Sequence, residues 1–343
     1  MHEQRAFGTG PPLTRRQLLK ITLAGGLLAA SGTSLWQWTN TPRLHAATFI
    51  GAAATYDLNL TQLIGQGFHE LGITAATIRG KRILLKPNLV ETHPGHEHIN
   101  THPFVVRAAA EAFLRLGASR VLVGEGPGHR QDTLQILEES GLAEVLNEDH
   151  IPFMNLNDLV GTSVPNAGKQ TALSTLTFPT VLHEVDWIVS MPKMKTHHWT
   201  GVTLSMKNLF GLMPGLYYGW PKNVFHHAGL HESILDITAT LKPHFAIVDG
   251  IVGMEGDGPL MGTPKPLGVL VMGRNLPAVD ATCARLMGID PYKIGYLSTA
   301  ENWLGPIHER DIEQRGERID SHQQPFRLLE HIPATRDIQL VKS

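Results

Sequence analysis

Short apolar runs alternate with amphipathic stretches along most of the chain, and this alternation predicts strands that alternate with helices. Buried strands are predicted at the short apolar runs 83–85, 121–123, 151–154, 176–178, 187–190, 245–248 and 268–272. Helices are predicted, from apolar residues three and four positions apart, at 103–116, 133–146, 231–241 and 279–287. Such an alternation favours an α/β fold in a single large domain, whose mostly parallel or mixed central sheet has helices on both faces.

Local residues sharpen some of these boundaries. Thr101 can cap the helix that begins near Pro103, because a threonine oxygen can accept a hydrogen bond from the first turn. Proline fits that first turn, since it lacks an N–H group that would otherwise go unpaired. Gly117 is expected to end this helix, and Gly141 is expected to break the next helical segment. The polar stretch 157–172 predicts a loop or a hairpin.

The N-terminal segment has the features of a targeting signal. Arg15 and Arg16 precede the apolar, small-residue stretch 21–30, which resembles a twin-arginine export signal. We therefore expect residues 1–45 to be a signal peptide or an uncleaved membrane anchor, followed by one α/β domain over 46–343. This predicts export by the twin-arginine machinery to the periplasm or the outer face of the cytoplasmic membrane. Membrane contact is expected only through this segment, if it is not cleaved.

The composition argues against some classes of protein. The 343 residues carry a net charge of −2, without a basic tract that would indicate a nucleic-acid partner. There are 19 histidines but one cysteine, Cys283. One thiol cannot hold an iron–sulfur cluster by itself, so we expect no such cluster. Any bound metal is expected to have oxygen and nitrogen ligands.

Polar residues gather directly after two of the predicted strands. Lys86 and Asn88 follow the run 83–85, and a lysine- and histidine-rich segment, 191–215, follows the run 187–190. Ligands bind at the carboxyl ends of strands in open α/β sheets, so this placement predicts a site for a small anionic molecule, which lysines can neutralise. The residues expected to act in catalysis are Lys193, Lys195, His197 and Lys207. Those expected to bind substrate are Lys86, Asn88, Asn208 and His226.

Histidines form three groups along the chain. In an extended strand, neighbouring side chains point to opposite sides, so one of His197 and His198 is expected to face a given ligand, and the other to face away. The same expectation holds for His226 and His227. The third group can bind a transition metal or can be a solvated loop, and it consists of His93, His96, His98 and His102.

A glycine-rich segment with three carboxylates follows the predicted strand at 245–248. Asp249, Glu255 and Asp257 are expected to hold a divalent metal ion, since carboxylate oxygens are ligands that Mg²⁺ and Mn²⁺ prefer. Zinc and iron are alternatives, and the sequence does not identify the metal. The same residues can instead cap the turns of a structural loop.

Several short motifs occur in a fixed order between about residues 80 and 300. They are Lys86-Pro87-Asn88, Thr101-His102-Pro103, Pro192-Lys193-x-Lys195-Thr196-His197, Lys207-Asn208-Leu-Phe-Gly211, Asp249-Gly250, Gly256-Asp257-Gly258-Pro259, and Ala278-Val279-Asp280 followed by Gly288-Ile-Asp290-Pro291. Together they resemble the bacterial and archaeal domain-of-unknown-function family 362. The resemblance implies a fold and a set of site positions, but no agreed reaction. Many relatives carry a ferredoxin-like segment with cysteine ligands, which this single-cysteine chain lacks.

These residues leave three hypotheses open. The first is a metal-assisted enzyme, a hydrolase or lyase, in which lysines bind a small anionic substrate and a histidine moves a proton. The second is a periplasmic protein that binds or delivers a metal or an anion without catalysis. The third is a protein with a nucleotide-like cofactor that is loaded before export. We favour the first, because the carboxylates, lysines and histidines can converge at one edge of the sheet.

Overall fold

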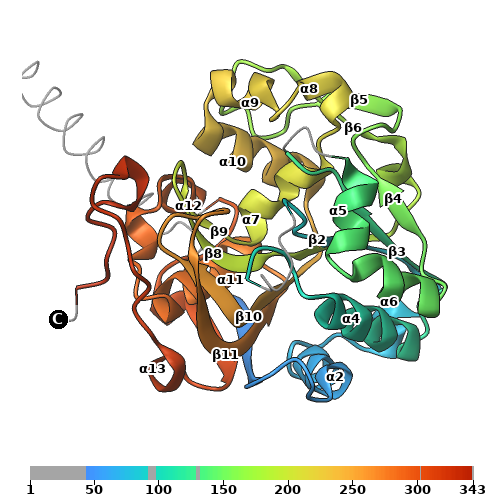
Figure 1. The fold of residues 1–343 in the computed structure, drawn as a ribbon, viewed down its shortest axis with the longest axis horizontal. Helices are drawn as coiled ribbons and strands as arrows, with labels where there is room; N and C mark the ends of the chain where they lie inside the picture. The colour runs from blue at the N-terminus through green and yellow to red at the C-terminus, as the bar shows by residue number, and fades with distance from the viewer. Residues whose placement is uncertain (1–43, 92–97, 129–131, 302, 342–343) are drawn as a thin grey trace, which may run out of the picture. The chain divides into compact units, whose positions relative to one another are not determined.

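Ten strands in the described part of the chain hydrogen-bond into one mixed sheet with helices around it (Figure 1). The computed structural model describes residues 44–91, 98–128, 132–301 and 303–341, so residues 1–43 of the predicted export segment 1–45 lie outside it. The strands are β1 Ala46–Ala52, β2 Arg82–Pro87, β3 Arg120–Glu125, β4 Phe153–Asn155, β5 Gly161–Pro165, β6 Thr175–Pro179, β7 Trp187–Met191, β8 Lys193–His197, β9 Gly201–Thr203, β10 Phe245–Glu255, β11 Thr263–Gly273 and β12 Ile312–Gly316. The helices are α2 Leu60–Glu70, α3 Ala75–Ile78, α4 Pro103–Arg115, α5 Thr133–Glu139, α6 Leu142–Glu148, α7 Ser205–Asn208, α8 Gly215–Tyr218, α9 Asn223–Ala228, α10 Leu230–Leu241, α11 Leu276–Leu286, α12 Gly295–Ala300 and α13 Ile319–His322.

The sheet combines a parallel half with an antiparallel half. Its strands lie in the order β12-β1-β11-β10-β7-β2-β3-β4, and β8 pairs with β10 and β9. Strands β10, β7, β2, β3 and β4 are parallel to their neighbours in this series, whereas β11 is antiparallel to both β10 and β1. The predicted fold class, an α/β domain with a mostly parallel or mixed sheet, is therefore confirmed.

Helices on the two faces of the sheet bury alternate residues of each central strand. In β2, Ile83 and Leu85 pack in one hydrophobic cluster with α2 and α4, whereas Leu84 packs in the other cluster with α7, α10 and α11. A strand that is buried on both faces has an unbroken apolar run, which is why the run at 83–85 predicts it correctly. None of the helices in the described ranges is both long enough and apolar enough to cross a membrane.

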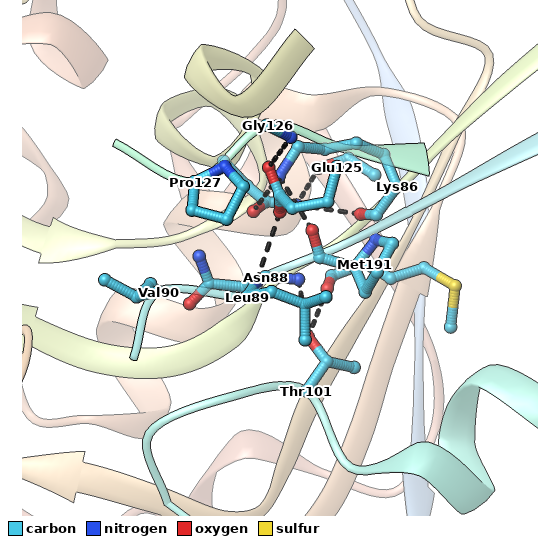
Figure 2. A network of polar contacts seen from close by, with 12 residues as sticks. Lys86, Asn88, Leu89, Val90, Thr101, Glu125, Gly126, Pro127 and Met191 are labelled. Carbon is cyan, nitrogen blue, oxygen red and sulfur yellow. Dashed lines mark hydrogen bonds and ion pairs between the residues drawn. The ribbon is translucent and has the colours of Figure 1, made fainter. Parts of the chain in front are cut away.

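Two local predictions near the helices have different outcomes. The helix α4 begins at Pro103 as predicted, but its N-cap is His102, whose Nδ1 accepts a hydrogen bond from the N–H of Phe104 at 3.2 Å. The hydroxyl of Thr101 instead donates to the carbonyl of Met191 at 2.6 Å, which ties this loop to β7 (Figure 2). The predicted break at Gly141 is confirmed, since this residue has a φ of 75° between α5 and α6.

The hydrophobic pattern does not predict several elements, among them β1, α2, β12 and the strand β8, which carries residues of the site. The strand β8 follows β7 after a single residue, Pro192, and continues along β10, with Lys193 opposite Asp249. Every residue of β8 is buried although three of its five residues are lysine or histidine. Polar side chains at such positions require nearby acceptors, and these acceptors define the surroundings of the site. The polar stretch at 157–172 contains β5, which forms a hairpin with β6.

Candidate functional site

A cavity of about 460 Å³ gathers polar side chains from separate elements of the fold. Residues at the carboxyl ends of β2 and β3, on β8, and on the helices α7 and α9 contribute to its lining. Its lysines are Lys86, Lys195, Lys207 and Lys222, and its histidines are His197, His198 and His226. Asn88, Asn208 and Asp257 line it as well. Eight of the eleven residues that the sequence proposes for the site therefore lie around one cavity.

Lys86 and Glu125 form a buried ion pair between the ends of two neighbouring strands (Figure 2). Nζ of Lys86 lies 2.5 Å from Oε2 of Glu125, and it also donates to Oδ1 of Asn208 at 2.9 Å and to a backbone carbonyl at 2.7 Å. The Glu125 carboxylate accepts further hydrogen bonds from the backbone N–H groups of Leu89 and Gly126. Burial lowers the pKa of Lys86, and the charge of Glu125 opposes this shift. All three ammonium protons of Lys86 are thus used within the protein.

Gly211 allows the segment after α7 to approach this ion pair closely. A Cβ atom at position 211 would lie 1.7 Å from Oε1 of Glu125 and 2.5 Å from Nζ of Lys86. On the other side of the pair, Nδ2 of Asn208 donates to the backbone carbonyl of Lys86 at 3.0 Å and to Oγ of Ser190 at 3.1 Å. These contacts fix α7 against the end of the sheet and thereby position Lys207.

Among the described residues, two further lysines have only neutral acceptors. Nζ of Lys195 donates to two backbone carbonyls, at 2.9 and 3.3 Å. Nζ of Lys222 donates to Oδ1 of Asn157 at 3.0 Å and to two backbone carbonyls. Burial lowers the pKa of Lys195 well below its ordinary value, and the positive charge of Lys207 adds to this shift. Burial also lowers the pKa of Lys222 to about 7.

Lys207 differs from these three lysines, because its amine has no hydrogen-bond acceptor among the described residues. Its Nζ lies 5.0 Å from the centre of the Phe210 ring, which is a cation–π distance. Burial lowers the pKa of Lys207 to about 8, the charge of Lys86 adds to this shift, and Glu125 opposes it. The positive charge of Lys207 in turn lowers the pKa of other lining residues, which are Lys195, His197, Lys222 and His226. Lys207 therefore interacts electrostatically with most of the ionisable residues of the lining.

His197 and His198 both line the cavity, whereas the sequence pattern predicts that only one of them faces a given site. The difference arises because β8 ends at His197 and the chain turns at His198. Nδ1 of His197 accepts the N–H of Trp199 at 3.1 Å, which leaves the ring proton on Nε2. Burial lowers the pKa of His197 well below its ordinary value, so this ring is neutral. In His198 and His226, Nδ1 donates to a backbone carbonyl at 3.0 and 3.2 Å. Burial lowers the pKa of His226, which favours a neutral ring with Nε2 as an acceptor.

Two buried polar atoms of the lining have no hydrogen-bond partner within the described ranges. They are Oδ1 of Asn88, after β2, and Oγ1 of Thr203, in β9. Leaving a buried donor or acceptor unpaired costs about 1–3 kcal/mol. Because both residues line the cavity, a molecule bound there can supply the missing partners.

Lys193 and Asp249 do not line this cavity, although the sequence predicts a site role for both. Nζ of Lys193 lies 2.7 Å from Oδ2 of Asp249, and both side chains are fully buried. The hydroxyl of Tyr56 and the backbone N–H of His102 also donate to the Asp249 carboxylate, at 3.1 and 3.0 Å. The ion pair accounts for the burial of both charges without a ligand.

The three carboxylates predicted to share a metal ion do not converge. The strand β10 continues to Glu255, so Asp249 and Glu255 are separated along a strand and not gathered in a loop. Oε2 of Glu255 accepts the N–H of Arg327 at 2.9 Å and lies 3.8 Å from Nζ of Lys265, whereas Asp257 is exposed at the cavity. In the described part of the chain, no group of three or more His, Cys, Asp and Glu side chains is placed to hold a metal ion.

The histidine group around residue 96 is only partly described. His93 and His96 belong to 92–97, which lies outside the described residues. His98 is buried, and the ring of His102 stacks on Tyr56 with 3.7 Å between the ring centres. Metal binding by His93, His96 and His98 therefore stays a prediction.

Comparison with known proteins identifies the family. The model of a family described as a domain of unknown function, DUF362, matches residues 83–285. The chain belongs to this family. A thylakoid-associated protein from Synechocystis sp. is 28% identical to this DUF362 protein over 229 residues, or 65% of this chain and 68% of that protein. A crystal structure of a protein from Thermotoga maritima is similar with 14% identity and a TM-score of 0.35, and covers 67% of this chain and 58% of that one.

Two charged lining residues of this DUF362 protein, Glu125 and Lys222, are absent from the sequence-based site. Glu125 follows the apolar run at 121–123, so the rule that selected Lys86 after its own strand could also have found it. Lys222 has no comparable signal, because it lies in an irregular segment between α8 and α9. Lys222 lines the cavity because the fold brings the segment between α8 and α9 next to it.

Asp280 supports the site from outside the cavity. Its carboxylate accepts hydrogen bonds from Oγ and N of Ser205, at 2.5 and 2.7 Å, and from N of Met206 at 3.1 Å. It therefore caps the start of α7, the helix that carries Lys207. The sequence places Asp280 in the first turn of its own helix, but α11 begins at Leu276, so Asp280 lies in the second turn. Burial raises the pKa of Asp280 to about 7.

Proposed function

We propose that the cavity binds a small molecule with a carboxylate or phosphate group. The observation that carries this proposal is the excess of lysine over carboxylate in the described lining. Four lysines line the cavity, whereas its carboxylates are Glu125 and Asp257, and Glu125 is already paired with Lys86. A bound anion supplies the counter-charge that buried lysines otherwise lack. Lys195 is the direct ligand: a bound anion opposes the lowering of its pKa and favours its ammonium form, and two carbonyl acceptors among the described residues leave one of the three ammonium protons available.

Neutral imidazoles with opposite proton roles favour an enzyme over a protein that only binds the anion. His197 carries its proton on Nε2, whereas His226, whose pKa is lowered by burial, presents Nε2 as an acceptor. A proton donor and a proton acceptor at one cavity suit acid–base chemistry. Hydrolase or lyase chemistry on a small anionic substrate is therefore our proposed class of reaction, with binding or delivery alone as the alternative.

The metal-assisted form of this reaction lacks a ligand set within the described ranges. Asp257 is the one member of the predicted carboxylate set at the cavity, and no three-ligand group surrounds it there. We therefore assign no step to a metal. Elemental analysis of the protein, purified without added metal, tests this part separately. A stoichiometric metal that is lost in Asp257→Asn would restore the metal-assisted hypothesis.

Calorimetric titration of the full chain with phosphate, succinate and lactate tests the anion site. At least one of these anions should bind, and Lys195→Met should weaken its binding by about tenfold or more, because a hydrogen bond to a charged group contributes about 1.5–3 kcal/mol. Lys81→Met is the matched control, since Lys81 is exposed and lies just before β2. Equal affinities for both variants and the wild type would contradict the proposal.

We also propose that residues 1–45 direct export by the twin-arginine route. Arg15 and Arg16 before the apolar stretch 21–30 support this, and the thylakoid-associated name of the relative is compatible with a membrane-associated or exported protein. Replacing both arginines by lysine should keep the protein in the cytoplasmic fraction. Unchanged export of that variant would contradict the proposal.

A further inference from the structure

We propose that Lys207 is a covalent nucleophile that forms a Schiff base with the carbonyl group of a small oxo acid. This inference rests on the proposed anion site, because the carboxylate of such a substrate would occupy it. It goes further by naming the substrate class and by giving one lysine a bond-forming role.

The contrast among the four lining lysines supports this assignment. Lys86 and Lys222 each donate to three acceptors, and Lys195 donates to two. Lys207 lines the same cavity and has no hydrogen-bond acceptor within the described part of the chain. A nucleophilic amine must keep its lone pair and its approach path clear. Of these four residues, Lys207 meets that condition.

The surroundings of Lys207 lower its pKa and so increase the fraction of its amine that is uncharged at neutral pH. Lys86 and Glu125 on the strand ends, Lys195 and His197 on β8, and Lys222 and His226 near α9 are the ionisable groups that act on it or respond to it. Its pKa of about 8 leaves roughly a tenth of the amine neutral at pH 7, whereas an exposed lysine with a pKa of about 10.4 is less than about 0.1% neutral. The share of reactive amine is about a hundredfold larger at Lys207.

The proposed step balances without an oxidant or a cofactor. The lone pair of the neutral amine attacks the carbonyl carbon, a C–N bond forms, and the carbonyl oxygen takes up a proton to give a carbinolamine. Loss of that oxygen with two protons as water then gives the imine. His197, which carries a proton on Nε2, and His226, which presents a free Nε2, are the donor and acceptor at the same cavity.

The remaining lining fits the other atoms of an oxo acid. Lys195 offers an ammonium proton to the carboxylate. Oγ1 of Thr203 and Oδ1 of Asn88 have no hydrogen-bond partner among the described residues. The Thr203 hydroxyl can donate to the oxygen of the carbinolamine, and Oδ1 of Asn88 can accept the proton of its hydroxyl group. A ligand therefore does not have to displace a hydrogen bond from another described residue at either atom.

Reductive trapping tests the inference on the full-length protein. The protein is incubated with pyruvate and sodium cyanoborohydride near pH 7, and adducts are located by peptide mass spectrometry. We expect one dominant adduct, on Lys207, formed at least about tenfold faster than on any surface lysine. Lys207→Arg, which keeps the positive charge but is not nucleophilic, should lose this adduct. Lys81→Arg is the matched control and should keep it.

Lactate separates this inference from the anion site itself, since it has the carboxylate of pyruvate but no carbonyl group. If lactate binds and the pyruvate adduct is absent from Lys207, the anion site stands and the Schiff-base inference is overturned. If phosphate, succinate, lactate and pyruvate all fail to bind and no adduct forms, both proposals fail. A trapped adduct spread evenly over surface lysines would also overturn the inference.

Discussion

The ammonium group of Lys193 lies 2.7 Å from a carboxylate oxygen of Asp249, and neither side chain is exposed. The pair connects β8 with β10, whose register places the two residues opposite each other. Hydrogen bonds from Tyr56 and from the backbone N–H of His102 further satisfy the carboxylate. Removing one partner of such a pair leaves the other charge buried without compensation. The pair is therefore expected to stabilise the fold at the edge of the site.

Lys193→Met should lower the free energy of unfolding by about 3–5 kcal/mol, because Asp249 loses its counter-charge. Urea denaturation measures this loss. The double variant Lys193→Met/Asp249→Asn should recover part of it, since no buried charge is then left unpaired. Anion affinity should change less than in Lys195→Met. A variant with normal stability but no anion binding would show that Lys193 belongs to the site after all.

Gly211→Ala should disrupt the Lys86–Glu125 ion pair, because the added Cβ would overlap Oε1 of Glu125. We expect a loss of about 1–3 kcal/mol in the free energy of unfolding, together with weaker anion binding. Gly65→Ala is the control: its Cβ would meet nothing within 4 Å, and Gly65 lies inside α2, where alanine favours the helix. Equal stabilities of the two variants would contradict the close packing described here.

The stability of the protein should depend on pH through Asp280. Its pKa is about 7 in the folded protein, whereas an aspartate in an unfolded chain has a pKa of about 3.9. The folded state therefore binds the proton more tightly, and the contribution of Asp280 to stability falls as pH rises from about 4 to about 7. The free energy of unfolding of the wild type, measured relative to Asp280→Asn, should increase when the pH falls from 8 to 5. An unchanged difference would contradict this assignment.

Anion affinity should decrease as pH rises through 7 and 8. Lys222 and Lys207 have pKa values of about 7 and 8, so the unliganded lining loses positive charge over this range. A bound anion favours the charged lysines, and each proton taken up on binding weakens the affinity by about tenfold per pH unit above the pKa. Calorimetry with lactate, whose charge is constant over this range, in two buffers of different ionisation enthalpy measures the proton uptake. Constant affinity with no uptake would contradict the charged lining.

Parallel strands and the polar residues that follow them are predictable from the sequence for a local reason. A strand buried on both faces needs an unbroken apolar run, and the carboxyl ends of parallel neighbours meet at one edge. Lys86 at the end of β2 and Asn88 directly after that strand accordingly line the cavity. β8 escapes prediction because its buried lysines and histidines have no apolar pattern.

The partners of the charged residues were decided by the tertiary structure. Lys193 and Lys195 lie two positions apart on β8, yet the first is paired with Asp249, and the second has only backbone carbonyls as acceptors in the described part of the chain. Spacing along a strand determines the side to which a residue points, but the register with β10 and the path of distant loops determine what it meets there. The sequence by itself established the α/β fold and the lysine- and histidine-rich segment, because both depend on local patterns along the chain. Only the folded chain showed that Lys207 is the cavity lysine without a hydrogen-bond acceptor in the described residues.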